Sequence, residues 1–305
     1  MRLPPFNPYF ILMIASIAIS SSAIFVKLAD QAPAGITAAY RLLFAVLFML
    51  PIVLIKYKHE FRFIHKKDWI LSIIAGLFLA LHFILWFESL NYTSVASSTV
   101  LVTMQPIFAF IGTYIFFQER FSYGAIISMI ITIIGGFTIS WGDFQFSGMA
   151  LFGDILALLG AVAVTIYFLA GQSTRKRVSL MTYTFIVYGV SALALIIYNA
   201  GMQNDFTGYP ADHWLMFLGL AIIPTFLGHT LFNWALKWLS SSTISMATLF
   251  EPVGATILAY FILGETITWS QFLGGAIVLF GLYLFILSTA RKTKVTIAKK
   301  NAPSK

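Results

Sequence analysis

Ten long apolar segments follow one another along this chain with almost no polar sequence between them. Each has about 17 to 25 residues, the length that a helix needs to cross a hydrocarbon layer ~30 Å thick. Backbone groups find no partners in lipid, so a spanning segment must be a helix or part of a barrel, and the period-two alternation of barrel strands is missing. The sequence therefore predicts an all-α membrane protein. The predicted spans are residues 9–29, 35–55, 69–87, 95–117, 122–140, 150–172, 181–199, 213–235, 243–263 and 270–288.

The composition excludes a soluble protein and several kinds of chemistry. Hydrophobic residues make up 59% of the 305 positions and charged residues 10%, against about 25% charged residues in a soluble domain. Because there is no cysteine, disulfides, thiolate metal sites and thiol nucleophiles are excluded. GxxxxGKS/T, GxGxxG and HExxH motifs are also missing. We therefore expect no cofactor, no metal site and no enzymatic activity, and any transport must draw on gradients rather than on a P-loop ATPase.

The net charge of +8 is arranged as in a membrane protein rather than a nucleic-acid-binding protein. If the chain has ten spans, seventeen of its nineteen Lys and Arg residues lie on one side of the bilayer. The positive-inside rule assigns that side to the cytoplasm, so we expect both termini there and the lipid bilayer as partner, with no nucleic acid. The two exceptions are Lys27 and Arg41.

The two halves of the chain match at a single shift of 146 residues. Ser122 also falls on Thr268, each just before an apolar run, and Thr268 with Gln271 has the spacing of a capping box. The first segment has a counterpart later in the chain, so we expect an uncleaved span rather than a signal peptide. The shift superposes Leu90 on Leu236, Pro106 on Pro252, Glu119 on Glu265 and Gly135 on Gly281.

Five spans, an odd number, separate each residue from its mate, so the second unit should enter the membrane inverted relative to the first. We expect a first repeat at 9–140 (helices 1–5), a second at 150–288 (helices 6–10) and a basic cytoplasmic tail at 289–305. Inverted repeats can open a central site to one side or the other, which favours transport by alternating access. Channels use inverted repeats as well, so a pore remains an alternative.

Three stretches resemble the EamA-type proteins of the drug/metabolite transporter superfamily. They read SSAIFVKLADQAPAGITAAYRLLFA, ASSTVLVTMQPIFAFIGTYIFFQERFSYGAIISMIITIIGG and TISMATLFEPVGATILAYFILGETITWSQFLGGAIVLFG. The last two share the order Pro, Glu, Gly, and the resemblance covers residues from about 10 to 288. It implies a ten-helix carrier of small organic solutes, often an exporter of amino acids or related metabolites, with a cavity between the halves. Where the family commonly has a tryptophan in the sixth span, residues 165–168 read TIYF.

Glu251 is the first candidate for a functional residue. It lies about two turns into the ninth span, and ionisable residues inside spans normally face protein or water. Pro252 cannot donate a backbone hydrogen bond, which leaves a carbonyl free one turn earlier. We interpret Glu251 either as a group that binds a substrate amine or exchanges a proton, or as a structural acid bonded to a neighbouring helix. Its repeat mate is Gln105, which cannot ionise.

Two further helix faces are polar in otherwise apolar spans. His82 and Trp86 lie on one face of the third span, and Thr225, His229 and Asn233 on one face of the eighth, because each set is spaced by four. These side chains could line a cavity and orient a solute. Alternatively, they form hydrogen bonds between helices, worth about 1 kcal/mol each in membranes.

Charged residues and glycines near the span ends allow simpler readings. Lys27 and Arg41 bracket the outer turn DQAPAG, where they should snorkel to the interface; the resemblance implies a second role, attracting carboxylates at the outer mouth. Glu119 and Glu265 should end helices and brace short turns. Glycines permit close packing within the chain or in a homodimer. They are Gly124, Gly135, Gly136, Gly274, Gly275 and Gly281.

These observations leave three classes of function. The first is a secondary active transporter of the prokaryotic inner membrane that exports a small organic metabolite such as an amino acid by alternating access through a central cavity. The second is a passive channel or a lipid or solute translocase. The third, an intramembrane enzyme, would need an acid, a base and a nucleophile at one depth, and only Glu251 with His229 could begin such a group.

Overall fold

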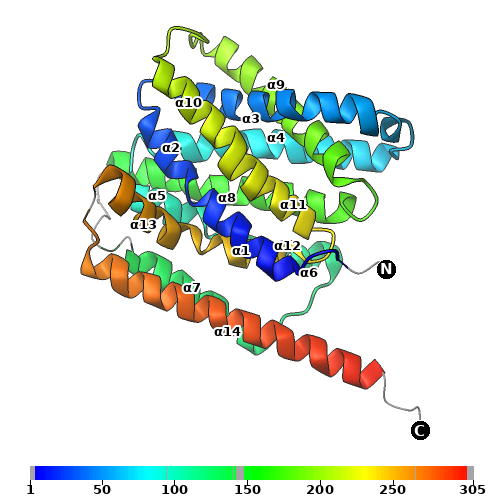
Figure 1. Cartoon of the computed structure of the whole chain (residues 1–305). Coiled ribbons are helices and arrows are strands. Elements are labelled where there is room, and N and C mark those ends of the chain that lie inside the picture. Colours follow the sequence, from blue (N-terminus) through cyan, green and yellow to red (C-terminus); the bar gives the residue numbers. More distant parts are fainter. Residues whose placement is uncertain (1–3, 94, 140, 142–147, 265, 301–305) are drawn as a thin grey trace.

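The computed structural model describes residues 4–93, 95–139, 141, 148–264 and 266–300, with side chains except at 95, 96 and 290–300. Helices and the turns between them form all of these ranges, without a strand (Figure 1). The first half contains α1 (Pro8–Ile19), α2 (Ser22–Leu28), α3 (Ala34–Ile52), α4 (Lys66–Ser89), α5 (Val95–Val102), α6 (Gln105–Phe117) and α7 (Tyr123–Ile139). The second half contains α8 (Gly148–Thr174), α9 (Leu180–Gly201), α10 (Ala211–Leu220), α11 (Leu231–Ala235), α12 (Ser241–Thr248), α13 (Glu251–Leu263) and α14 (Trp269–Lys300).

The helices reproduce the apolar segments of the sequence. In the described ranges, nine helical stretches are long and apolar enough to cross a membrane, and a tenth apolar helix, α7, is shorter. Several stretches combine two helices that are nearly continuous, so the number of helices exceeds the number of spans. The chain is therefore a multi-pass helical membrane protein. The nine stretches are Pro8–Leu28, Ala34–Tyr57, Lys66–Ser89, Ser97–Phe117, Gly148–Thr174, Leu180–Gly201, Ala211–Ala235, Ser241–Leu263 and Trp269–Thr289.

Two spans are interrupted at corresponding places in the two halves. The fourth breaks between α5 and α6, and the ninth between α12 and α13. In each case Gln105 or Glu251 opens the second piece and a proline follows it. Proline lacks a backbone donor and is tolerated only in the first turn of a helix, so Pro106 and Pro252 start new helices rather than continue old ones. The two breaks are 146 residues apart, the shift that relates the halves of the sequence.

The ends of α6 and α13 correspond in the same way. Gln118, which follows α6, has φ of 54°, and Gly264, which follows α13, has φ of 70°. Both residues take the left-handed conformation that commonly ends a helix. Further along the second half, Gln271 donates its backbone N–H to the Thr268 hydroxyl at 3.3 Å and Thr268 donates to the Gln271 side chain at 2.9 Å. The predicted capping box is therefore confirmed.

The eighth span widens in its middle. Between α10 and α11, residues Ala221–Thr230 form π-helical turns around Pro224. The Thr225 hydroxyl donates to the Leu220 carbonyl at 2.8 Å, five residues earlier. Such π segments often lie at functional sites, because they shift the side chains that follow off the regular helical register.

Glycines bring α7 and α14 together along one edge of the molecule (Figure 1). A Cβ atom on Gly274 would lie 2.5 Å from the Ile139 nitrogen and 2.6 Å from the Gly135 carbonyl oxygen. The two backbones are therefore in direct contact, as small-residue interfaces in membranes allow. Gly281 packs against Thr132 of the same partner helix. These glycines serve packing within the chain, and the homodimer stays a prediction.

A carboxylate braces a turn on the basic side of the molecule. The Glu119 carboxylate accepts hydrogen bonds from the Ser240 hydroxyl at 2.9 Å and the Ser242 hydroxyl at 3.0 Å. The expectation that Glu119 braces a turn is confirmed, and the contact joins the end of α6 to the start of α12. Its repeat mate Glu265 lies outside the described residues.

Candidate functional site

Arg41 is wholly buried at the centre of the helical bundle. Its Nε donates to the Thr225 hydroxyl at 2.7 Å and its Nη1 donates to the Ser22 hydroxyl at 2.8 Å. The guanidinium carbon lies 4.3 Å from the centre of the Phe83 ring, a cation–π contact. One side chain of α3 thus joins α2, α4 and the π-helical segment of the eighth span.

This position corrects the two expectations for Arg41. The side chain neither snorkels to the interface nor stands at an outer mouth, because its helix face turns inward and meets two hydroxyls and an aromatic ring. Closeness to a span end in the sequence does not reveal which face of the helix points into the bundle. Lys27, at the end of α2, is exposed.

His82, Trp86 and His229 come together from two spans. The His82 ring stacks on Trp86 with centroids 5.7 Å apart, and it lies 6.4 Å from the His229 ring. His82 Nδ1 is 3.0 Å from the Gly160 carbonyl oxygen. A carbonyl can only accept, so Nδ1 carries the proton and Nε2 is left as an acceptor. The two polar faces expected from the sequence therefore face each other.

Asn233 fixes the next turn of the eighth span. Its amide nitrogen donates to the His229 carbonyl at 2.8 Å and to the Tyr167 hydroxyl. Tyr188 shares a hydrogen bond of 2.9 Å with the Thr230 hydroxyl. Tyr167 and Phe168 also flank His229, with ring centroids 6.0 Å and 6.4 Å away.

Sequence reasoning did not single out Tyr167 and Phe168 as site residues. They belong to the TIYF stretch, which stands where the resembling family commonly has a tryptophan. The residue types differ from the family's tryptophan, but Tyr167 and Phe168 are also large aromatic residues, and both rings lie beside His229. The position of the TIYF stretch was therefore the signal in the sequence that could have identified Tyr167 and Phe168. Ser22, a small hydroxyl in an apolar run, carried no signal at all.

Gln105 and Glu251 open the two half-helices after the breaks, and both are 3% exposed. Glu251 therefore does not face lipid. Its carboxylate interacts electrostatically with Arg41, without a direct ion pair in the described part of the chain. The Gln105 backbone carbonyl lies 3.5 Å from the Thr165 hydroxyl of α8.

Several buried polar atoms of these residues have no protein partner within the described ranges. Two are donors, Arg41 Nη2 and Trp86 Nε1, and three are acceptors, Gln105 Oε1, Asn233 Oδ1 and Glu251 Oε1. His229 Nδ1 belongs to the same set. Leaving a buried polar atom unpaired costs about 1–3 kcal/mol, more for a charged group, so a cluster of such atoms needs a reason. We call Arg41, His82, Trp86, Gln105, His229, Asn233 and Glu251 the central polar group.

A second set of polar contacts joins helices near the basic loops. Arg177 donates to the Asp68 carboxylate at 2.5 Å and 3.0 Å, and this contact raises the pKa of Arg177 above its usual value. Thr182 donates to Glu60 at 2.6 Å, linking α9 to the loop after α3. Gln172 accepts from the backbone and hydroxyl of Ser241 at 2.6 Å and 2.7 Å.

Arg175 connects this side of the protein to the central polar group. Its Nε donates to the Asn233 carbonyl at 3.0 Å, and Nη1 donates to the Val178 carbonyl. Burial lowers the pKa of Arg175 to about 10, so the group remains charged at neutral pH. In the part of the chain that the structure describes, no group of three His, Asp or Glu side chains could hold a metal ion.

The fold is that of a multi-pass helical membrane protein with a buried group of polar residues. A model of the EamA-like transporter family matches residues 7–141 and 151–287, so the chain consists of two copies of this unit and belongs to that family.

Curated relatives agree with this assignment. An uncharacterized transporter of Archaeoglobus fulgidus is 25% identical over 199 residues, covering 65% of this chain and 70% of the relative. The uncharacterized transporter sll1164 of Synechocystis is 27% identical over 259 residues, covering 79% and 72%. The uncharacterized transporter YxxF of Bacillus subtilis is 26% identical over 234 residues, covering 76% and 74%.

A solved crystal structure shares the fold. It superposes with a TM-score of 0.76 at 17% sequence identity, covering 93% of this chain and 98% of the other. At this identity the likeness concerns the arrangement of the helices alone.

Proposed function

We propose that this protein is a secondary active transporter of the prokaryotic cell membrane that exports a small organic metabolite by alternating access. The observation that carries the proposal is the central polar group. It brings a buried cation and a buried acid within electrostatic reach of each other while each keeps an unpaired polar atom.

The chemistry of these atoms favours an amphoteric solute such as an amino acid. A substrate carboxylate would accept from Arg41 Nη2, and a substrate ammonium would donate to Glu251 Oε1. Trp86, His229 and the Tyr167 ring would border an apolar or aromatic part of the solute, as small-molecule sites usually combine a few polar groups with such walls. The repeat mate Gln105 would add a neutral acceptor.

The broken spans support an alternating-access mechanism with inverted repeats. In transporters of this design, discontinuous helices from the two halves form the substrate site near the membrane midplane. Here both breaks, both left-handed helix ends and both proline-led half-helices are related by one shift across five spans. The contacts around Arg177, Gln172 and Glu119 would form the gate on the cytoplasmic side, where the basic loops place both termini.

Counterflow into proteoliposomes tests the proposal. Purified protein is reconstituted with an unlabelled amino acid inside and is screened with labelled amino acids and metabolites at two pH values. We expect saturable counterflow for at least one amphoteric solute. A passive channel, the alternative function, would give flux that neither saturates nor exchanges, and that result would contradict the carrier.

The variant Glu251→Gln separates the roles of the acid. We expect it to weaken the affinity for an amphoteric solute on the order of tenfold, since one charge-assisted hydrogen bond is lost. Glu88→Gln, at the end of α4, where the carboxylate accepts from Tyr92, is the matched control and should transport normally. Unchanged affinity and unchanged pH dependence in Glu251→Gln would make this acid a structural residue.

A further inference from the structure

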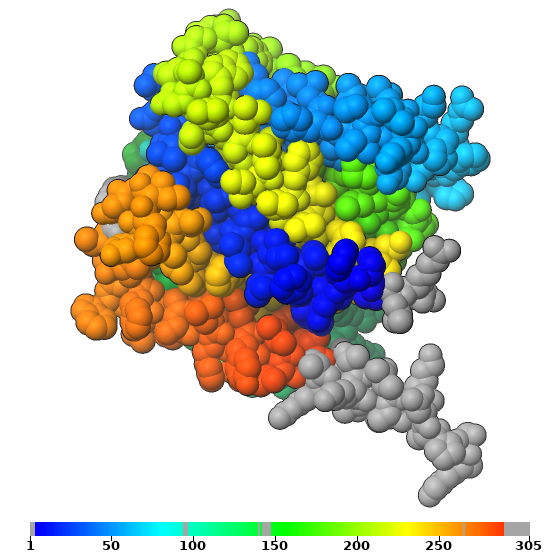
Figure 2. Space-filling view, in the orientation of Figure 1, coloured from blue at the N-terminus to red at the C-terminus, as the bar shows by residue number. Residues whose placement is uncertain are grey.

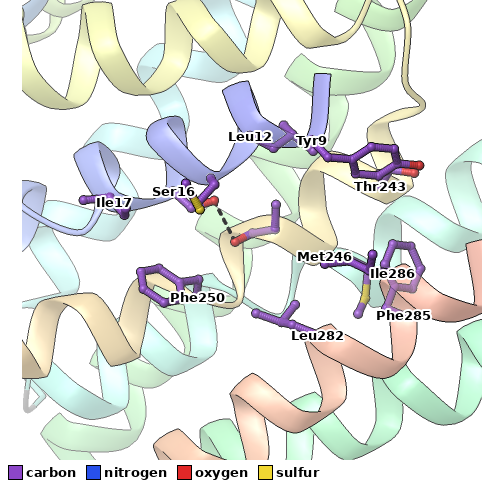
Figure 3. A pocket seen from close by; sticks show the side chains of 12 residues that line it. Tyr9, Leu12, Ser16, Ile17, Thr243, Met246, Phe250, Leu282, Phe285 and Ile286 are labelled. Carbon is purple, nitrogen blue, oxygen red and sulfur yellow. Dashed lines mark hydrogen bonds between the residues drawn. The ribbon is translucent and has the colours of Figure 1, made fainter. Parts of the chain in front are cut away.

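An apolar groove lies between α1 and α14 on the outer surface of the bundle, on the face where Figure 2 shows the blue N-terminal helices above the orange to red C-terminal helix. Its volume is about 170 Å³. Met13 and Ile17, one turn apart on α1, form one wall and are 52% and 53% exposed. Leu282 and Ile286, one turn apart on α14, form the other (Figure 3). The two walls do not close on each other, because α14 packs along α7 instead of α1.

The floor of the groove is the outer side of the break in the ninth span. Met246, Ala247 and Phe250 form it, and Phe250 directly precedes Glu251. At the break the Ala247 carbonyl accepts from the Phe250 N–H, three residues on, at 3.2 Å, and from the Ser16 hydroxyl at 3.0 Å (Figure 3). This pairing removes the polar groups of the floor from contact with a ligand. The groove thus suits a hydrocarbon and not water or a polar solute.

We propose that an acyl chain of an anionic phospholipid from the cytoplasmic leaflet occupies this groove. The walls belong to membrane-spanning helices, so hydrocarbon is the medium that meets them. The volume is similar to that of apolar protein cavities that take up a benzene-sized molecule, about 150 Å³. Lipid tails are as apolar as the groove, so the gain comes from close packing against a fixed shape rather than from the hydrophobic effect.

Charge decides the kind of headgroup. The end of the groove at Tyr9 and Ile286 is the end nearest to the basic tail, since α14 runs on from Ile286 to Lys300. Six Lys and Arg residues follow Thr289 in the sequence. Basic residues at the cytoplasmic surface attract anionic lipids by about a fivefold gain in affinity each. The groove would thus hold the acyl chain, and the basic segment that follows it in the sequence would attract the headgroup of the same lipid.

Native mass spectrometry of the full-length protein in detergent tests the proposal. The protein is titrated with dioleoylphosphatidylglycerol or with dioleoylphosphatidylcholine, and bound lipids are counted. In Met13→Trp the indole should fill the groove and weaken the tightest lipid by about tenfold, since on the order of ten atomic contacts are displaced. Ala247→Leu fills the groove from its floor and should act in the same direction. Leu193→Trp, at an exposed position of α9, should bind as the parent does.

Loss of the tightest lipid in the two groove variants, with Leu193→Trp unaffected and melting temperatures preserved, supports the proposal. Normal binding in either well-folded groove variant, or an equal loss in the control, overturns it. Replacing Arg291, Lys292 and Lys294 together by Gln should reduce phosphatidylglycerol affinity by about fivefold per charge and leave phosphatidylcholine unchanged. An unchanged phosphatidylglycerol affinity would overturn the choice of an anionic lipid.

Discussion

Replacing Arg41 by Lys keeps the buried charge but removes the fork that joins three helices. The guanidinium donates to Thr225 and Ser22 through different nitrogens and covers Phe83. A lysine has one compact nitrogen that cannot take the same planar, forked geometry. Interhelical hydrogen bonds in membranes contribute about 0.6 kcal/mol on average and up to about 1.7, and the cation–π contact adds about 0.5–2 kcal/mol.

We expect Arg41→Lys to lose one of the two bonds and part of the ring contact, which sums to about 1–2 kcal/mol of unfolding free energy. The same change removes the unpaired Nη2, so the affinity for a solute carboxylate should fall on the order of tenfold. Reversible unfolding in mixed micelles measures the first quantity and proteoliposome counterflow the second. Lys58→Arg, the reverse exchange at an exposed loop position, is the control.

The result that would refute this reasoning is an Arg41→Lys protein with parental stability and parental affinity. It would mean that only the charge matters at this position and not the geometry of its donors. A loss of stability with unchanged affinity would instead confine Arg41 to a structural role.

Three further predictions concern packing and the cytoplasmic side. Gly274→Ala should lower the unfolding free energy by about 1–3 kcal/mol because its Cβ meets the α7 backbone, whereas Gly189→Ala, which meets nothing within 4 Å, should be neutral or stabilising in the same thermal unfolding assay. Arg177→Gln should open the cytoplasmic side, so that a cysteine placed at Ser241 in this cysteine-free chain reacts faster with a thiol reagent than in the parent; equal rates would contradict a gate there. Asp68 raises the pKa of Arg177, so this bond is fully present below the usual arginine pKa and is lost only as the pH rises past the raised value. The ratio of the labelling rates of Arg177→Gln and of the parent at position 241 should therefore not change between pH 6 and 9, since the thiolate fraction of the cysteine rises in both proteins, and a change in this ratio would show that other groups control this side.

Much of the architecture was predictable because membrane helices are constrained locally. A run of about twenty apolar residues has few alternatives to a spanning helix, so the helical segments could be located closely. The prolines at 106 and 252 are a local signal for the two breaks, since neither can continue a helix, but the predicted spans 95–117 and 243–263 ran through both positions. Spacing by four also placed His82 with Trp86 and His229 with Asn233 on common faces.

Which faces meet was not predictable in the same way. Arg41 shows the limit, because its inward orientation depends on Ser22, Thr225 and Phe83, which come from three other elements. Tyr167 was missed because the residue pattern of its span does not distinguish it from a lipid-facing aromatic residue, and only the place of the TIYF stretch in the resembling family pointed to it. Its role beside His229 depends on the bond from Asn233 of another span.

The sequence by itself determined the class of the protein, the positions of its apolar helices along the chain and the correspondence of its two halves, because each of these depends on length, hydropathy and local backbone chemistry. Only the tertiary structure decided that Arg41, the two histidines and Glu251 lie together in the interior. The physical reason is that burial of a charge is settled by partners from distant segments, and the packing of the helices against one another brings those partners into reach.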